Sequence, residues 1–342
     1  MSLKKKNSIF IAVVTIVSVL LYWGGTFADG PSGYTGLGHA PALSPDDTTI
    51  AFSYFHNGEA ALYTSPSSGG EAQLLHKPDQ GYSYIRPSYS PGSSKLVFIK
   101  QWEEEERLRS QLMIYNEDEE KVRPLIGHEE FVTEAVFSPD GEHIYFLKAG
   151  VYKNYSDIAQ KKPHDFDIFK MNIKSGEIEQ ITSSKAYTMS SLQVSSDGEQ
   201  LLYSTFDGKD VIKMINLESK NTRTITPGPD YTSAAAQGPI LSSPSLSPDG
   251  KTIAFSDVGS KSEHGTYQYE LFMMNHKGEK VEQVTNFHEH VSQPIFFHHS
   301  SELLVTINRN FAGRNPDNEY WRMEQDGSHA EEILIEIPSK GS

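Results

Sequence analysis

The sequence contains no cysteine among its 342 residues. Disulfide bonds, a lipid-modified cysteine and a cysteine nucleophile are therefore excluded. The Gly-x-Ser-x-Gly elbow of serine hydrolases and the phosphate-binding P-loop are also missing from the sequence. A catalytic site of any of these kinds is therefore not expected.

Positive charge is scarce, with 30 Lys and Arg against 45 Asp and Glu. The first 28 residues hold three lysines and no acidic residue, so the rest of the chain is still more acidic. Such a surface repels nucleic acid and anionic lipid, so no nucleic acid partner is expected. Neutral or basic partners, or a metal ion, fit this charge better, although solubility alone explains it more simply.

One long hydrophobic run is present, from Ile9 to Trp23. It follows Lys4–Lys6 and is followed by Thr26–Ala28, an arrangement typical of a signal peptide. Extended to Ala28, the same segment is long enough to be an uncleaved membrane anchor. Both alternatives for residues 1–28 stay open, and both place residues 29–342 outside the cytoplasm. The protein is then secreted, or tethered to a membrane through residues 9–28 alone.

A motif of the type Ser-Pro-Asp-Gly repeats along the chain at intervals of 46 to 57 residues. The copies are Ser44-Pro45-Asp46-Asp47, Ser90-Pro91-Gly92-Ser93, Ser138-Pro139-Asp140-Gly141, Ser195-Ser196-Asp197-Gly198, Ser247-Pro248-Asp249-Gly250 and a degraded sixth, His298-His299-Ser300-Ser301. An apolar column follows eight residues after the start of each copy, at Phe52, Phe98, Phe146, Tyr203, Phe255 and Thr306. A turn motif between apolar runs with alternating spacing predicts a β-hairpin.

Two further strands are predicted in each repeat, such as Leu271–Met274 and Glu282–Thr285. Each repeat is then a four-stranded antiparallel meander, and a period of this length is typical of a propeller. The fold class expected is all-β: a six-bladed β-propeller over residues 39–340, after a linker at 29–38 and the N-terminal signal or anchor helix. The blades are expected to start near residues 39, 85, 133, 190, 242 and 293. Two unrelated β-domains are the disfavoured alternative, and how the ring closes is left open.

The repeat resembles the propeller of the TolB family, periplasmic partners of the Tol-Pal system. The resemblance is carried by Ser247–Gly250, Ile253–Phe255, Leu271–Met274 and Gln283–Thr285, and it extends over roughly residues 39–337. It implies a binding or scaffold protein outside the cytoplasm. TolB proteins also have an α/β domain before the propeller, which this chain is expected to lack. A WD repeat is a weaker resemblance, because the sequence has no Trp-Asp dipeptide.

A meander sorts its loops between two faces of the ring. Turns within the two hairpins of each blade lie on one face, named here the short-turn face. The longer segments fall on the opposite, long-loop face; they are Gln101–Ser110, Lys148–Asp167, Pro227–Ser242, Asp257–Glu270 and Arg309–Glu319. These segments carry aromatic residues that are predicted to bind a partner, namely Trp102, Tyr152, Tyr155, Tyr231, Tyr267, Tyr269 and Phe311. Alternatively, some of these rings only cover the edges of blades.

The innermost strands are expected to line a central channel with polar residues. The residues concerned are His39, Arg86, Glu134, Ser191, Ser243 and Gln293. Arg86 and Glu134 have the same register on adjacent blades, so they are predicted to pair. The channel then binds a ligand or an ion such as calcium, or it is a water-filled structural lining, which is the simpler interpretation. Asp165, Asp167 and Asp317 also offer calcium ligands, but no twelve-residue calcium loop is present.

No metal site and no other cofactor are expected. His288 and His290 precede the first strand of the sixth repeat, and His298 and His299 follow it. About five residues of strand separate the two pairs by about 17 Å, too far for one zinc ion to bridge. Oligogalacturonate lyases bind a metal in a propeller channel through a His-rich site, but the inner strands of this chain carry no His cluster.

Taken together, these patterns predict a monomeric, non-enzymatic binding propeller outside the cytoplasm. Its aromatic and acidic long-loop face would be presented to an envelope protein or a glycan. The alternative is a polysaccharide hydrolase or lyase that uses carboxylates on the same face or in the channel. Such an enzyme would need two carboxylates about 5–10 Å apart around a cleft.

Overall fold

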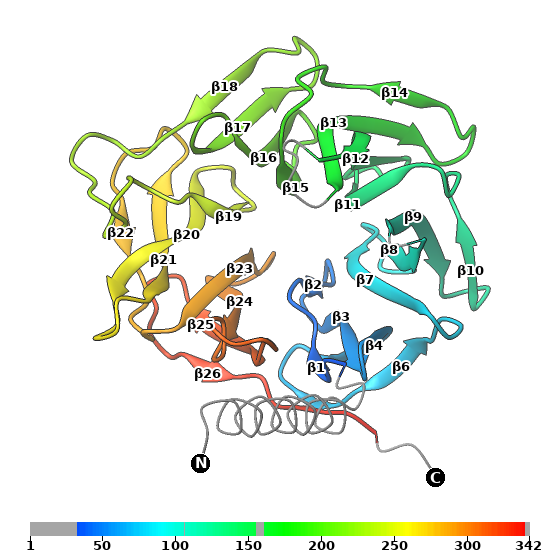
Figure 1. Ribbon diagram of the computed structural model, residues 1–342, viewed down its shortest axis with the longest axis horizontal. Coiled ribbons are helices and arrows are strands. Elements are labelled where there is room, and N and C mark those ends of the chain that lie inside the picture. Colours follow the sequence, from blue (N-terminus) through cyan, green and yellow to red (C-terminus); the bar gives the residue numbers. More distant parts are fainter. Residues whose placement is uncertain (1–32, 106, 155–160, 339–342) are drawn as a thin grey trace, which may run out of the picture.

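The computed structural model describes residues 33–105, 107–154 and 161–338, and all of its regular elements in these ranges are β-strands. The strands form sheets that stand as blades around a central channel (Figure 1). The fold is therefore an all-β propeller, as the repeats predict. In the described part of the chain, no helix is long and apolar enough to cross a membrane. The predicted signal or anchor helix at 1–28 lies outside the described residues, as does Tyr155.

The first four sheets follow the repeats in order. The first contains β1 (Gly36–Leu37), β2 (Ala42–Leu43), β3 (Thr49–His56), β4 (Glu59–Pro66) and β6 (Gln73–His76). The second contains β7 (Tyr82–Tyr89), β8 (Lys95–Glu104), β9 (Arg107–Asn116) and β10 (Lys121–Pro124). The third contains β11 (Phe131–Phe137), β12 (His143–Lys153), β13 (Lys162–Asn172) and β14 (Ile178–Gln180). The fourth contains β15 (Met189–Val194), β16 (Gln200–Phe206), β17 (Asp210–Asn216) and β18 (Thr222–Ile225).

The remaining strands form an eight-stranded sheet and a strand pair. The larger sheet contains β19 (Ser242–Leu246), β20 (Thr252–Lys261), β21 (Tyr267–Asn275), β22 (Glu282–Gln283), β23 (His290–Phe296), β24 (Glu302–Asn308), β25 (Asn318–Glu324) and β26 (Glu331–Glu332). Its two antiparallel halves are joined by one parallel contact, between Tyr269 and His290. The pair consists of β5 (Gly70–Glu71) and β27 (Ile335–Glu336), which run parallel.

The repeated motif forms a turn that satisfies its own polar groups. In the third copy, Ser138 Oγ donates to Asp140 Oδ1 over 2.5 Å, and the same carboxylate oxygen accepts from the backbone N–H of Glu142 at 2.8 Å. Ser138 Oγ also accepts from the N–H of His143 at 3.0 Å, where the next strand begins. The serine hydroxyl lowers the pKa of the Asp140 carboxyl, because it stabilises the charged form. Serine and aspartate at this spacing therefore stabilise the hairpin.

Neighbouring turns also pack against one another around the ring. A Cβ placed on Gly141 of the third turn would lie 3.6 Å from Pro91 of the second. The same holds for Gly198 of the fourth turn and Pro139 of the third. In these two pairs the proline of one turn lies against the glycine of the next, so the motif here spaces the blades as well as closing the hairpins.

The core lies between adjacent sheets rather than inside one of them. One cluster joins Val97 and Leu112 of the second sheet to Ile144 and Phe146 of the third. The phenylalanines of the predicted apolar column are fully buried, namely Phe52, Phe98, Phe146 and Phe255. Truncation of such a ring to alanine typically costs about 3–5 kcal/mol. This explains why the inner strands are apolar on both faces.

Ring closure uses residues from both ends of the described chain. β27 pairs with β5 of the first repeat, and the N–H of Gly70 donates to the carbonyl of Leu334 at 2.8 Å. From β25, the Tyr320 hydroxyl donates to the carbonyl of Gly38 at 2.6 Å, and Asn318 Nδ2 donates to the carbonyl of Leu37 at 2.8 Å. The last repeat is therefore tied to the first by backbone and side-chain hydrogen bonds.

Candidate functional site

A hollow of about 490 Å³ lies on the channel axis and opens at the short-turn face. It extends from Arg86 and Glu134 on the inner strands outward to turn prolines such as Pro91 and Pro139. Inner-strand residues of every repeat line it, and half-buried Val136 is among its apolar wall residues. This hollow is named the funnel, with its floor at Arg86 and Glu134 and its rim at the turns.

The floor residues are placed by irregularities in the inner strands. Arg86, Ser191, Ser243 and Gln293 have φ angles of 54°, 57°, 48° and 51°, in the left-handed region. A shift in strand register occurs at each of these positions. Proline, which cannot donate to the ladder, follows in three of the four strands, at Pro87, Pro244 and Pro294. Such bulges turn a side chain out of the ladder, here toward the axis.

The floor carries one ion pair, between Arg86 and Glu134. Arg86 Nη1 lies 2.5 Å from Glu134 Oε1, and the other carboxylate oxygen accepts from the backbone N–H of Leu192 at 2.9 Å. This is the pair that the register of the repeats predicts. The Glu134 residue is only 8 % exposed. A single carboxylate thus links the inner strands of three neighbouring sheets, namely β7, β11 and β15.

Other floor residues also bond across the blades. Gln293 Nε2 donates to Ser243 Oγ at 3.1 Å. Two residues after Ser191 on β15, the Gln193 side chain donates to the carbonyl of Leu246 at 3.0 Å and accepts from the backbone N–H of Leu246 at 2.7 Å. These contacts favour a structural lining at the floor, while the volume above it remains available to a ligand.

His39 is set apart from the other predicted channel residues, because it does not line the funnel. Its ring stacks on His290 with 6.4 Å between centroids. The His39 residue is exposed to solvent, although neighbouring protein groups lie close to its ring. Burial, the positive charge of Arg86 and the nearby His290 lower the pKa of His39 to about 4. The ring is therefore neutral near pH 7.

Three of the five long segments on the opposite face are largely strands, which corrects the expectation of loops there, whereas Pro227–Ser242 and Arg309–Glu319 are mostly irregular. β8 and β9 continue their ladder to Glu104 and Arg107, and Trp102 pairs with Arg109 within it. β12 and β13, and likewise β20 and β21, extend in the same way. Antiparallel hairpins keep their backbone hydrogen bonds as they leave the core, so polar sequence there does not end the strand.

The predicted aromatic residues of this face are half-buried and lie in separate places. Trp102 contacts Tyr82, with 5.7 Å between ring centroids. Tyr152 lies under the guanidinium of Arg107, whose Cζ is 4.4 Å from the ring centroid. Tyr267 packs with Lys261, whose Nζ is 4.8 Å from the ring. The structure therefore does not gather these rings into one patch.

Three further aromatic predictions fall near the ring closure or in the core. Tyr269 and Phe311 contact His290, with ring centroids 4.8 Å and 5.6 Å away. Tyr231 packs on Phe272, and its hydroxyl donates to Asp257 Oδ2 at 2.7 Å. Burial and the Asp257 carboxylate raise the pKa of this tyrosine well above its usual range. Its position is that of a structural anchor for the link before β19.

Sequence reasoning missed two exposed rings on the long-loop face. Tyr187 and Phe206 are 46 % and 44 % exposed, and their ring centroids are 6.4 Å apart. Both lie outside the long segments of this face, at the ends of short ones. An aromatic residue at the last position of a second strand would have been the signal for Phe206.

The predicted calcium ligands Asp165, Asp167 and Asp317 do not form a group with the spacing of a metal site within the described residues. Asp167 is buried and accepts from Thr182 Oγ1 at 2.8 Å and from the N–H of Ser184 at 2.7 Å. Within the described ranges, one group of side chains has spacing suited to a metal ion, formed by Asp140, Glu142 and His143. This group lies at a turn rather than in the channel, and Asp140 already accepts two turn hydrogen bonds.

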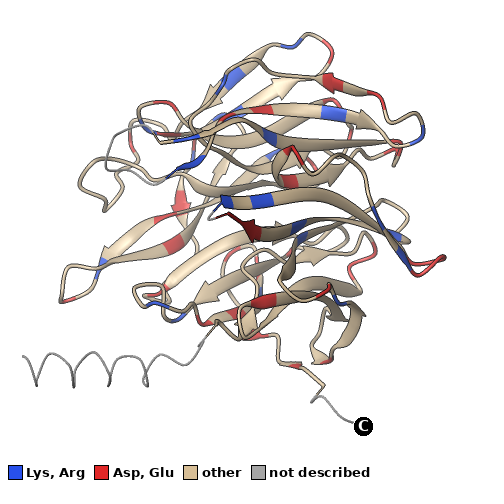
Figure 2. Cartoon of the chain, turned by 45° about the vertical axis from the view of Figure 1, so that its right-hand side comes forward, with Lys and Arg blue, Asp and Glu red and all other residues tan. Residues whose placement is uncertain are grey.

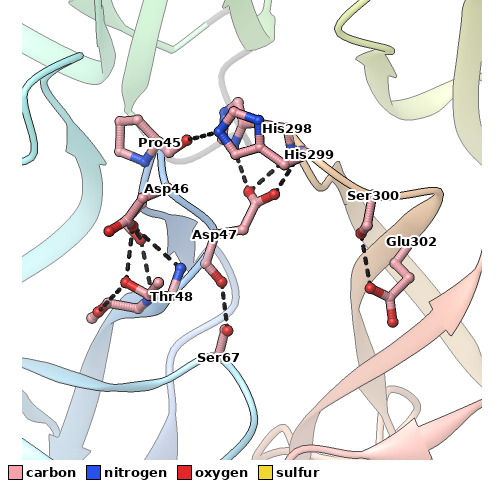
Figure 3. Close-up of polar contacts among 11 residues, drawn as sticks. Pro45, Asp46, Asp47, Thr48, Ser67, His298, His299, Ser300 and Glu302 are labelled. Atoms are coloured by element: carbon pink, nitrogen blue, oxygen red, sulfur yellow. Dashed lines mark hydrogen bonds and ion pairs between the residues drawn. The ribbon is translucent and has the colours of Figure 1, made fainter.

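The first and sixth turns meet at the rim of the funnel, a contact named here the seam (Figure 3). Asp47 Oδ1 accepts from the N–H of His298 at 2.9 Å and from its Nδ1 at 2.7 Å, while Oδ2 accepts from the N–H of His299 at 2.7 Å. His299 Nε2 lies 3.0 Å from the carbonyl of Pro45. Because a carboxylate only accepts, Nδ1 of His298 carries the proton.

The seam is formed by two copies that each depart from the motif, the first and the sixth. Asp47 occupies the glycine position of its turn, with a left-handed φ of 63°. His299 occupies the proline position of the sixth copy. Between the second and third turns, and between the third and fourth, these two positions touch as proline and glycine. At the seam, a carboxylate and backbone amides replace that apolar contact.

The fold, its funnel and its repeated turns define the class of this protein as a β-propeller with a central hollow open at one face. Residues 34–237 match the model of the TolB β-propeller domain, which is more than half of the 342 residues. The chain belongs to this family. The match covers the first four sheets of the propeller and contains no part of an N-terminal α/β domain. A search of the curated proteins finds no match to the chain.

Solved structures show the same fold at low sequence identity. TolB from Acinetobacter baumannii is 15 % identical with a TM-score of 0.58, over 95 % of this chain and 68 % of that one. An oligogalacturonate lyase in complex with manganese is 16 % identical with a TM-score of 0.54, over 83 % and 76 %. The oligogalacturonate lyase from Vibrio parahaemolyticus is 12 % identical with a TM-score of 0.53, over 84 % and 89 %.

Proposed function

We propose that this protein is a non-enzymatic binding propeller outside the cytoplasm, whose funnel receives a segment of an envelope protein or a glycan. We further propose six blades, with the eight-stranded sheet counted as two. The single parallel contact between Tyr269 and His290, beside full antiparallel pairing within each half, supports this count. The position outside the cytoplasm rests on the family and on the expected signal or anchor at residues 1–28, and a monomer is proposed.

The funnel is the observation that carries the proposal. Its volume of about 490 Å³ is within the usual range for ligand pockets, about 300–1,000 Å³. Half-buried Val136 and Ile295 give its wall apolar surface, and Arg86, Ser191 and Gln293 give polar groups at depth. An apolar wall with a few converging polar groups is the usual composition of a binding site.

The turns around the rim favour a neutral or basic ligand, although their motif aspartates do not themselves line the funnel. Hydrogen bonds from the turn serines lower the pKa of the four motif aspartates, Asp46, Asp140, Asp197 and Asp249. These carboxylates therefore stay charged into the acid range. Asp and Glu are spread over the strands and turns of the whole molecule (Figure 2), so the rim adds to a generally negative surface.

The composition of the funnel supports binding rather than catalysis. Among the described residues that line it, Glu134 is the single carboxylate, and both of its oxygens already accept hydrogen bonds. Hydrolysis of a glycosidic bond usually needs two carboxylates. The polysaccharide hydrolase or lyase remains the alternative prediction, and likeness of fold to oligogalacturonate lyases at 12–16 % identity adds nothing to it.

The experiment places a photo-crosslinking amino acid at Ser196, an exposed rim residue, and recovers adducts from envelope extracts and a glycan array. Ser183, an exposed residue of the link before β15, is the matched position away from the funnel. Adducts are expected from Ser196 and not from Ser183, and a bulky Ser88→Trp substitution inside the funnel should abolish them. Adducts that form equally at both positions, or that survive Ser88→Trp in a folded protein, would contradict the proposal.

A further inference from the structure

A second hollow lies off the axis, between the first and second sheets at the short-turn face. It has a volume of about 410 Å³ and is named here the crevice. We propose that the crevice binds a lysine or arginine side chain of a polypeptide partner. Tyr89 is the one residue that lines both the crevice and the funnel. The two sites are therefore distinct, and this proposal does not depend on ligand binding in the funnel.

The floor of the crevice belongs to the core between the two sheets. Tyr115 and Leu96 are buried there, with Tyr89 and Leu75 packed against the same cluster. The floor of the crevice is therefore set in strands, while turn residues such as Asp46 and Glu117 form part of its walls. Its shape is expected to be present before any ligand arrives, which reduces the entropy cost of binding.

The charge around the crevice favours a cation. Asp46, Glu71 and Glu117 line it, and Lys95 is the one basic residue among the described residues that do so. Burial, Glu117 and Asp46 raise the pKa of Tyr89, and burial and Glu117 raise that of Tyr115. The field of these carboxylates thus reaches the phenol groups at the floor, where an anionic group would be repelled.

The other walls suit the two parts of a basic side chain. Hydroxyl groups that can accept from an ammonium or guanidinium come from both sheets; the residues are Thr48, Thr49, Thr64, Ser93 and Ser94. Leu74 on β6 is 51 % exposed and forms an apolar part of the wall. Lysine and arginine combine an apolar stem with a charged head, so the stem can lie on Leu74 while the head reaches the carboxylates.

The probe is a short fluorescein-labelled peptide of alternating glycine and lysine. It is titrated with the full chain at about 0.15 M salt, and binding is followed by fluorescence anisotropy. The test variant is the double substitution Glu71→Gln with Glu117→Gln. The matched control is Asp118→Asn with Glu119→Gln, which removes the same charge from the β9–β10 turn outside the crevice lining. Melting curves confirm that each variant is folded.

The test variant is expected to bind the peptide about tenfold or more weakly, because two of three carboxylates are lost. The control should change binding less than about threefold, and Ser88→Trp in the funnel should leave it unchanged. Equal losses in test and control variants would overturn the proposal, since they indicate only net charge. Equal affinity for an acetyl-lysine peptide would also overturn the proposal, because the positive charge would then not matter. Spermidine binding as tightly as the peptide would overturn it too, because a free amine would then suffice.

Discussion

Substitution of Asp47 by glycine restores the repeat motif and removes the seam. The carboxylate accepts two backbone hydrogen bonds and one from His298 Nδ1. At about 1 kcal/mol each, these bonds are together worth about 3 kcal/mol at a partly exposed site. Glycine relieves the left-handed φ of 63°, which returns about 1 kcal/mol. The expected net loss is about 2 kcal/mol, or on the order of 4 °C in Tm.

The matched control is Ser93→Gly, since Ser93 occupies the same turn position in the second copy with a φ of 60°. Its substitution changes the backbone cost alone, and it should be neutral or slightly stabilising. Chemical denaturation gives both free energies of unfolding, and hydrogen exchange at β5 and β27 reports local opening of the ring. If Asp47→Gly is as stable as Ser93→Gly, the seam does not hold the ring and strand pairing alone closes it.

Three further predictions concern single residues. His39→Asn should flatten the loss of stability between pH 6.5 and about pH 4 in acid titrations. Because the pKa of His39 is lowered in the folded protein, the folded state binds fewer protons than the unfolded chain, so wild-type stability falls as pH drops through this window. Tyr231→Phe should cost about 1–2 kcal/mol in denaturant melts, as its hydroxyl bonds buried Asp257; no loss would refute the anchoring role. Glu134→Ala should cost about 3 kcal/mol or more, since it leaves Arg86 unpaired and a buried N–H unsatisfied; a loss below about 1 kcal/mol would contradict the structural floor.

The propeller could be predicted from sequence because its signals are local. Four of the six turns have Ser and Asp two residues apart, and Phe146 and its equivalents follow at a fixed distance on the second strand. The pairing of Arg86 with Glu134 also follows from register, since both lie four residues before their turns. Repeats give each of these signals several times, so the pattern stands out from chance.

Features that depend on contacts between distant residues could not be predicted. The two-residue parallel pairing of β27 with β5 has no local pattern, and it joins Ile335 to Gly70. The seam could not be predicted because Asp47 and His299 are two separate departures from the motif in the sequence. Their hydrogen bond becomes evident only when the fold brings the first and sixth turns together. The exposure of rings such as Phe206 is likewise set by packing and not by residue type.

The most direct test of the central proposal is crosslinking from the funnel rim. With the photo-crosslinker at Ser196, the account predicts a specific protein or glycan adduct that is lost when Ser88→Trp fills the funnel. The same variant must keep the wild-type melting temperature, so that the loss reports the cavity and not unfolding. An adduct of unchanged yield in the filled funnel would contradict the account.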